Sequence, residues 1–164
     1  MLKKLLLLVV TGFFLASCAA TNTQQGGDVD AASSSTSSGS DSSITAGTQE
    51  DLIVNVGDRV FFEFDSSELT VDAQATLDAQ AAWLTQYPDT NITIEGHADE
   101  RGTREYNLAL GDKRAFAVYS YLAQAGIDTN RMEYISWGKE RREVVGSDET
   151  AYSQNRRGVT TVTN

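Results

Sequence analysis

The sequence predicts an α+β fold, an α/β sandwich in which two main helices pack on a mixed sheet of about four strands. Apolar residues recur with a period of two in some segments and with a helical period in others, and the two kinds of segment alternate along the chain. The segments lie between residues 52 and 164, which is the length of one ordinary domain. A chain of 164 residues leaves no room for a second domain of that size.

The first half of this region predicts two strands and the first main helix. A strand is expected at 60–64, where Val60, Phe62 and Phe64 lie on one side that must be core. Thr70 is a candidate N-cap of a helix that runs to Tyr87-Pro88. The inner face of that helix is predicted to carry Ala73, Leu77, Ala81 and Leu84. Ile92 and Ile94 then alternate with polar residues in a second strand.

The second half predicts the other main helix and two further strands. The helix is expected over about 105–125, the third strand over 132–137 and the fourth over 159–163. The inward positions of the helix are predicted to be Leu108, Ala115, Val118 and Leu122. A turn-rich stretch at 138–148 and a short helix at 150–157 separate the last two strands.

Residues 1–17 have the pattern of a bacterial lipoprotein signal peptide. Two lysines precede an apolar run that is shorter than the roughly 20 residues a membrane-spanning helix needs. The run ends in LASC (15–18), which resembles the box where lipid is attached to the cysteine and the chain is cleaved just before it. We therefore expect lipid on Cys18, the only cysteine, although an ordinary signal peptide with a chance cysteine has the same start.

Residues 18–51 are expected to link the lipidated cysteine to the domain as a flexible tether. Residues 19–51 contain no aromatic residue, and eight of the eleven residues from 33 to 43 are serine. Such a segment cannot bury enough apolar surface to offset the entropy lost on ordering it. The three predicted parts are therefore the signal peptide (1–17), the tether (18–51) and the folded domain (52–164).

Charge and composition argue against several classes of function. The chain carries 13 Lys and Arg against 23 Asp and Glu, a formal charge of −10, which disfavours sequence-independent binding to nucleic acid. One His and one Cys cannot build a Cys/His zinc site, and a single Cys excludes a disulfide within the chain. We expect no metal and no cofactor.

Four sequence runs closely resemble the OmpA-like domain superfamily and, within it, the peptidoglycan-associated lipoproteins. They follow one another over about 52–164, and the lipoprotein box at Cys18 agrees with the same group. The runs are FFEFDSSEL (61–69), GHADERGTREYNLALGDKRAFAV (96–118), ISWGKE (135–140) and AYSQNRRGV (151–159). Several motifs in the same order over a whole domain make a chance match very unlikely.

The resemblance implies non-covalent binding to the diaminopimelate residue of peptidoglycan. The free end of that residue carries an ammonium and a carboxylate on one carbon, so a receptor needs an anion and a forked cation close together. By resemblance, Asp99 takes the ammonium and Arg114 takes the carboxylate. The resemblance also assigns Phe64, Asp65, His97 and Leu110 to the slot, with backbone groups of 97–102. For His97 a hydrogen-bonded structural role is the alternative, and for Asp65 a turn.

The resemblance also implies a location and partners. It places the chain at the outer membrane, facing the periplasm, with Ala19 rather than Asp after Cys18. The implied role is in the Tol-Pal system, in envelope integrity and in constriction at division. The implied partners are peptidoglycan, the periplasmic propeller protein TolB, and beyond it TolA and other outer-membrane proteins.

Purely structural roles for these residues, and other functions for the chain, remain open at this point. Asp99 and Arg114 could form an internal salt bridge, and Asn155-Arg156-Arg157 could brace the last strand. A cell-wall hydrolase would use Asp65 and Asp99 as acid and base, but the chain has no Cys-His pair or Gly-x-Ser-x-Gly elbow for nucleophilic catalysis. We expect no enzyme. A nearer rival is another OmpA-like wall anchor of a secretion or motor system.

The sequence departs from the family pattern at several positions. Ala98 stands where Thr is usual, Arg104 where Pro is common, and Arg141-Arg142 where the family has Lys-Pro. The end of the chain, 160–164, is also more polar than usual. These changes bear on affinity for the ligand and leave its class unchanged.

Overall fold

The computed structural model of the protein describes residues 44–164. The predicted signal peptide, Cys18 and most of the predicted tether lie outside the described residues. Within residues 44–164 no helix has the length and apolar character needed to span a bilayer.

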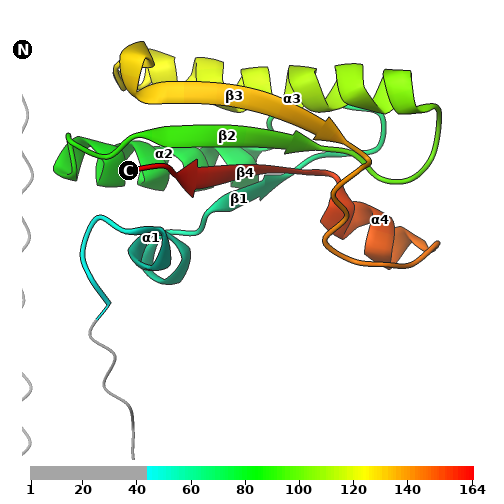
Figure 1. Ribbon diagram of the computed structural model, residues 1–164, viewed down its shortest axis with the longest axis horizontal. Helices are drawn as coiled ribbons and strands as arrows, with labels where there is room; N and C mark the ends of the chain where they lie inside the picture. Colours follow the sequence, from blue (N-terminus) through cyan, green and yellow to red (C-terminus); the bar gives the residue numbers. More distant parts are fainter. Residues whose placement is uncertain (1–43) are drawn as a thin grey trace, which may run out of the picture. The chain divides into compact units, whose positions relative to one another are not determined.

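The described chain forms four α-helices, one short 3₁₀ helix and a four-stranded sheet (Figure 1). In chain order the elements are α1 (Gln49–Asn55), β1 (Arg59–Phe61), α2 (Val71–Gln86), β2 (Ile92–His97), α3 (Arg104–Gln124), η1 (Thr129–Arg131), β3 (Met132–Gly138), α4 (Glu149–Asn155) and β4 (Arg157–Val162). The predicted α+β class and the mixed four-stranded sheet are confirmed.

The strand order of the sheet is β1-β4-β2-β3. β4 runs antiparallel to both β1 and β2, while β2 and β3 are parallel and are joined through α3. β1, β2 and β3 therefore all end at the same edge of the sheet, where β4 begins. The segments that follow β1 and β2 meet at this edge.

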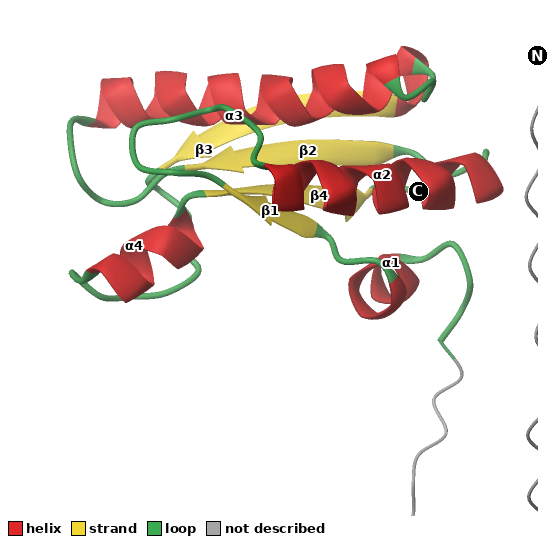
Figure 2. Ribbon diagram, turned by 180° about the vertical axis from the view of Figure 1, so that it is seen from behind, coloured by secondary structure: helices red, strands yellow, loops and turns green. Residues whose placement is uncertain are grey.

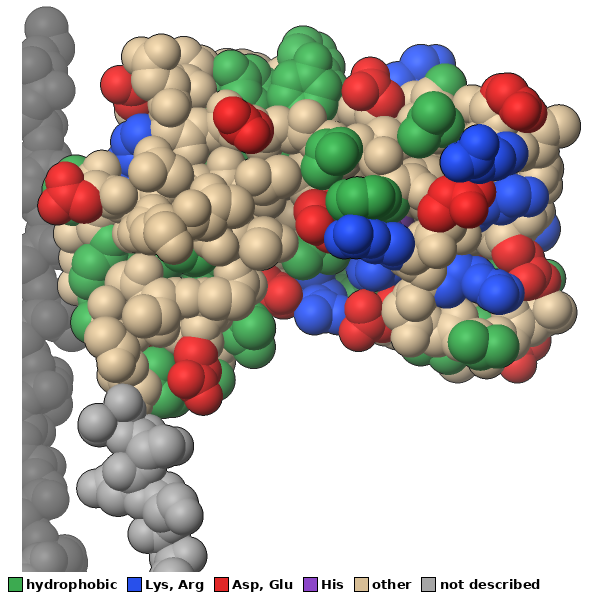
Figure 3. All heavy atoms as spheres, in the orientation of Figure 1, with side chains coloured by type: hydrophobic (Ala, Val, Ile, Leu, Met, Phe, Trp, Pro, Cys, Tyr) green, Lys and Arg blue, Asp and Glu red, His purple; other side chains and the backbone are tan. Residues whose placement is uncertain are grey.

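Helices α2 and α3 lie side by side on one face of the sheet (Figures 1 and 2). Between them and the strands lies one apolar core, whose fully buried members include Leu77, Leu84, Ile92, Ile94, Val118 and Leu122. In the view onto the other face, charged side chains of both signs gather at the α4 end of the domain (Figure 3). That end carries the ion pairs of Arg101 with Glu149 and of Arg142 with Glu100.

The predicted start of the first main helix is confirmed. The hydroxyl oxygen of Thr70 accepts a hydrogen bond from the backbone N–H of Ala73, which satisfies one of the free donors of the first turn of α2. Thr103 caps α3 in the same way by accepting from Tyr106. Both caps fix where the helices begin, and α3 begins directly after the 96–102 motif.

Two expectations about buried residues are wrong. β1 ends at Phe61, and Phe64 is 61% exposed, because the chain leaves the sheet after the buried Phe62 and turns at Glu63–Ser66. Leu108 is 49% exposed. The inner positions at that end of α3 are instead Asn107, Gly111 and Arg114, so the buried stripe of the helix is polar and small there rather than apolar.

The folded part begins before residue 52, the boundary that the sequence suggested. Gln49 of α1 accepts a hydrogen bond from the Val162 backbone N–H, and Asp51 accepts one from the indole N–H of Trp83 at 2.9 Å. Leu52 is fully buried beside them. Polar side chains thus attach α1 to the domain, which an analysis of apolar content does not detect.

Two glycines allow α3 to lie directly on β2 and β3. A Cβ on Gly96 would overlap the carbonyl oxygen of Gly111, and a Cβ on Gly111 would overlap the hydroxyl of Ser136. The same hydroxyl donates to the carbonyl of Leu108 at 2.6 Å. This close contact of backbones sets the height of the helix over the ends of the strands.

Replacing either glycine with alanine should weaken the fold. We expect Gly96→Ala and Gly111→Ala each to lower the free energy of unfolding in urea by about 2 kcal/mol, because the added methyl must push α3 off the strands. Gly158→Ala on the neighbouring strand is the control, since its Cβ would meet only side-chain atoms at 3.2 Å or more. Equal losses in all three variants would contradict the prediction.

Candidate functional site

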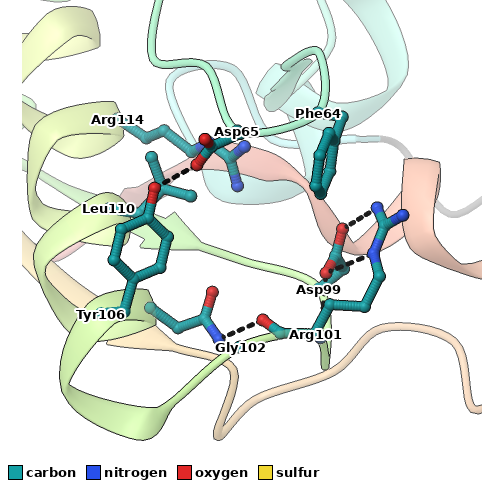
Figure 4. Close-up of a pocket in the computed structure, with 9 residues that line it drawn as sticks. Phe64, Asp65, Asp99, Arg101, Gly102, Tyr106, Leu110 and Arg114 are labelled. Atoms are coloured by element: carbon teal, nitrogen blue, oxygen red, sulfur yellow. Dashed lines mark hydrogen bonds and ion pairs between the residues drawn. The ribbon is translucent and has the colours of Figure 1, made fainter.

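Three segments enclose a cavity of about 180 Å³ at the edge where β1 and β2 end (Figure 4). The segments are the turn after β1, the loop after β2 and the first turns of α3. The lining residues are Phe64, Asp65, Asp99, Arg101, Gly102, Tyr106, Asn107, Leu110 and Arg114. Five of the six slot residues expected from sequence are thus brought together, and His97 is the exception.

Arg114 is fully buried at the inner end of the cavity. Its guanidinium donates three hydrogen bonds to backbone carbonyls, those of Ser66 (2.8 Å), His97 (2.8 Å) and Glu63 (3.1 Å). A guanidinium has five N–H groups, so two are not used by these bonds. Burial and the nearby charge of Arg156 lower the pKa of Arg114 to about 10, which leaves it charged at neutral pH.

No ion pair joins Arg114 to Asp99 within the described part of the chain, so the internal salt bridge considered from sequence does not form. Instead, the two Asp99 carboxylate oxygens accept from the side chain of Arg101 at 3.1 and 2.5 Å, and one also accepts from its backbone N–H. Arg156 lies 3.5 Å from the same carboxylate. Burial favours a higher pKa for Asp99, but these contacts outweigh it and hold the pKa below its usual value.

Asp65 adopts a left-handed backbone conformation, with φ of 54°. Asp is one of the few residues other than Gly that adopt this conformation readily, and strained backbone of this kind clusters at binding sites. Its carboxylate accepts a hydrogen bond from the hydroxyl of Tyr106 on α3, and this bond raises the pKa of the tyrosine. The bond joins the turn after β1 to α3 across the cavity.

The cavity contains three side chains that the sequence reasoning missed, those of Arg101, Tyr106 and Asn107, while Gly102 belongs to the loop backbone that it expected there. Asn107 donates to the carbonyl oxygens of Arg101 (2.7 Å) and Thr103 (3.1 Å), and so holds the loop against α3. A signal existed for two of the three. Tyr106 and Asn107 lie four and seven residues before Leu110 and Arg114, which is the spacing of one helix face.

His97 does not line the cavity with its side chain. The ring is buried on the other face of the sheet, with Nδ1 3.2 Å from the carbonyl of Arg141 and Nε2 3.2 Å from Glu95. Side chains alternate across a strand, and Gly96 already faces α3, so His97 must face away. Only its carbonyl reaches the site, as an acceptor for Arg114.

Asn155 and Arg156 make contacts of the kind expected if Asn155-Arg156-Arg157 brace the last strand. Asn155 accepts from the backbone N–H of Glu143 (2.7 Å) and donates to the carbonyl of Val144 (2.8 Å). Arg156 donates to the carbonyl of Phe62 at 3.0 Å, which ties the start of β4 to the end of β1. Through Asp99, Arg156 also reaches the cavity.

Within residues 44–164 no group of three or more His, Cys, Asp or Glu side chains is placed to hold a metal ion. The cavity itself presents two guanidinium groups, those of Arg101 and Arg114, two carboxylates, those of Asp65 and Asp99, and the aromatic rings of Phe64 and Tyr106.

Comparison with known proteins decides the family. The model of the OmpA family matches residues 61–157. The chain belongs to the OmpA family. It is 60% identical over 116 residues to proteins of Rhizobium meliloti and Brucella melitensis, both named peptidoglycan-associated lipoprotein, covering 71% of this chain in each case. The match spans about two thirds of those relatives, 66% of the first and 69% of the second.

Solved structures share the fold of this OmpA family domain. The crystal structure of the peptidoglycan-associated lipoprotein from Burkholderia pseudomallei has a TM-score of 0.63 and 43% identity, covering 65% of this chain and 90% of that one. The C-terminal domain of Helicobacter pylori MotB has a TM-score of 0.62, covers 65% of this chain and 84% of that one, and is 20% identical. That second likeness shows the common fold alone.

The burial of His97 predicts a specific loss of stability in mild acid. Burial and the charge of Arg157 lower the pKa of His97 to about 4 in the folded protein, against about 6.5 when unfolded. Between these values the unfolded chain binds the proton and the folded chain does not, so stability falls as pH falls from 6.5 to 4. We expect a loss of about 3 kcal/mol in the free energy of unfolding from this group.

Two measurements check this prediction. Because His97 is the only histidine of the chain, its ring signals in an NMR titration need no assignment. A midpoint near 6.5 in the folded protein would contradict the prediction. In urea unfolding, His97→Gln should flatten the dependence of stability on pH between 4 and 6.5, whatever it does to stability at pH 7.

Proposed function

We propose that the domain binds peptidoglycan without a covalent bond and holds the free end of a diaminopimelate residue in the cavity between Asp99 and Arg114. One observation carries the proposal. The buried Arg114 has no carboxylate within ion-pair distance among the described residues, retains N–H groups that its three carbonyl bonds do not use, and lines a cavity that also contains a carboxylate. A buried cation of this kind gains most from an anionic ligand.

The size and polarity of the cavity agree with this ligand. A volume of about 180 Å³ is that of a site for one small group, such as the end of one amino-acid side chain. Asp99 would accept the ammonium and Arg114 would bind the carboxylate, while Phe64 and Leu110 contact the carbon chain. Peptidoglycan as the polymer is supported by the names of relatives that are 60% identical to this chain.

The proposal extends to a role for the whole protein. With lipid on Cys18, the chain would tie the outer membrane to the cell wall and act in the Tol-Pal system during envelope constriction at division. TolB and TolA are the proposed protein partners. This extension is supported by the lipoprotein box and by the family of the domain.

The hydrolase alternative receives no support from the site. A glycosidase needs one carboxyl group whose pKa is raised so that it can donate a proton. The pKa of Asp99 is lowered, by its bonds with Arg101, and Asp65 is engaged by Tyr106. Binding is therefore the function that the geometry favours.

Specificity for diaminopimelate is the first test. Wild-type protein should sediment with diaminopimelate-type sacculi far more than with lysine-type sacculi, because lysine lacks the carboxylate that Arg114 would bind. Removing one member of a desolvated charged pair costs about 2 to 5 kcal/mol, so Arg114→Ala and Asp99→Asn should each weaken binding roughly thirtyfold or more.

Lys113→Ala is the matched control for this test. Lys113 is the exposed neighbour of Arg114 on α3, so its loss changes the net charge equally and should leave binding unchanged. Circular dichroism must accompany the assay, because Arg114 also holds three carbonyls and an unfolded variant would imitate the loss. Folded Asp99→Asn and Arg114→Ala that still sediment normally would leave the proposed site without support.

The lipid anchor is tested separately. Cys18→Ser should abolish incorporation of labelled palmitate and move the protein out of the outer-membrane fraction, because no other cysteine is present to accept the lipid. The soluble variant should still bind sacculi in vitro. Labelling of the serine variant at the wild-type level would refute the assignment.

A further inference from the structure

The proposed acceptor for the ligand's ammonium is already occupied by the protein itself. The guanidinium of Arg101 makes two hydrogen bonds with the carboxylate of Asp99, the shorter at 2.5 Å (Figure 4). Paired bonds between arginine and a carboxylate are among the stronger polar interactions in proteins. A cationic ligand that approaches Asp99 therefore meets an anion that is already neutralised.

Of the two arginines beside Asp99, only Arg101 is free to leave. Arg156 is buried and is bonded through Nε to the carbonyl of Phe62. The side chain of Arg101 is 35% exposed at the mouth of the cavity. Its own backbone is held by Asn107, so a movement would involve the side chain alone.

A second carboxylate lies within reach of the Arg101 side chain. Its guanidinium lies between two aromatic rings, 4.2 Å from the centroid of Phe64 and 4.3 Å from that of Tyr152. Glu149 in the first turn of α4 is 3.6 Å from Nη1 of Arg101 through one carboxylate oxygen, is exposed, and pairs with Arg156 at 2.8 Å through its other oxygen. A small rotation would exchange Asp99 for Glu149 while the guanidinium stays stacked on Tyr152.

We propose that Arg101 is an internal competitor for the ligand: its guanidinium occupies the ammonium position on Asp99 and moves toward Glu149 when the ligand binds. This rests on the proposed function and adds a selection rule to it. A ligand end without a positive charge cannot replace the guanidinium, because releasing Arg101 would leave Asp99 with only Arg156. The site then accepts only ligands whose ammonium compensates for the displaced arginine.

Replacing Arg101 should raise the affinity for the ligand, whereas replacing an ordinary contact residue lowers it. When the binding-competent state is only partly populated, the apparent affinity falls by that fraction, and removing the competitor restores it. We expect Arg101→Ala and Arg101→Gln to bind a soluble muropeptide that carries diaminopimelate roughly three- to tenfold more tightly than wild type. Arg101→Gln keeps most of the bulk between the two rings without the charge.

Arg104→Ala is the matched control. It removes one positive charge three residues away, from a side chain that is 73% exposed, pairs with Glu140 and does not line the cavity. Its affinity should equal that of wild type. This comparison separates the release of Asp99 from a general change in the charge of the domain.

The experiment is a calorimetric titration with two probes, the diaminopimelate muropeptide and the same molecule with its free side-chain amine acetylated. Tighter binding of the amine form by both Arg101 variants, with no gain for the acetylated form, is the expected result. In wild type, the Nε–H signal of Arg101 should shift on addition of the amine form. Weaker or unchanged binding by the Arg101 variants would overturn the competitor role while wild-type binding upholds the proposed function. Wild type that binds neither probe would overturn the proposed function and the inference with it.

Discussion

The buried guanidinium of Arg114 holds the site together, because its three hydrogen bonds join α3 to the turn after β1 and to the end of β2. A charge in this position loses its hydration, and carbonyl dipoles compensate only in part, which the lowered pKa of Arg114 reflects. The same arrangement gives the cavity a fixed cation. The contact of Gly96 with Gly111 is what brings α3 near enough for these bonds.

Local charges, rather than net charge, govern what this domain can bind. The chain has a formal charge of −10, yet three arginines and two aspartates meet at one end of the sheet. An acidic protein gains no long-range attraction for an anionic polymer, so the proposed binding to peptidoglycan would depend on contacts of a few ångströms. Salt at physiological concentration screens exposed, distant charges more strongly than it screens the charge of the buried Arg114.

In the domain without ligand, the guanidinium of Arg101 neutralises the carboxylate of Asp99. In this state the carboxylate of Asp99 is ionised and accepts hydrogen bonds from Arg101, whose guanidinium is stacked on the ring of Phe64. The proposed exchange from Asp99 to Glu149 would need no change of fold. It would use two carboxylates that are both already near one arginine.

The sequence by itself determined the class of the fold, most of its helices and strands, and five of the residues around the cavity. The helices and strands follow from local rules, since alternation, helical spacing and caps such as Thr70 depend on neighbours in the chain. The five cavity residues followed instead from the resemblance of the sequence motifs to a known family. The tertiary structure alone decided which charges pair. Whether Asp99 meets Arg101 or Arg114, whether α1 docks through Gln49 and Asp51, and which way His97 faces all depend on side-chain hydrogen bonds set by the packing of the chain. Such bonds have no period in the sequence, because their partners come together only when the helices settle on the sheet.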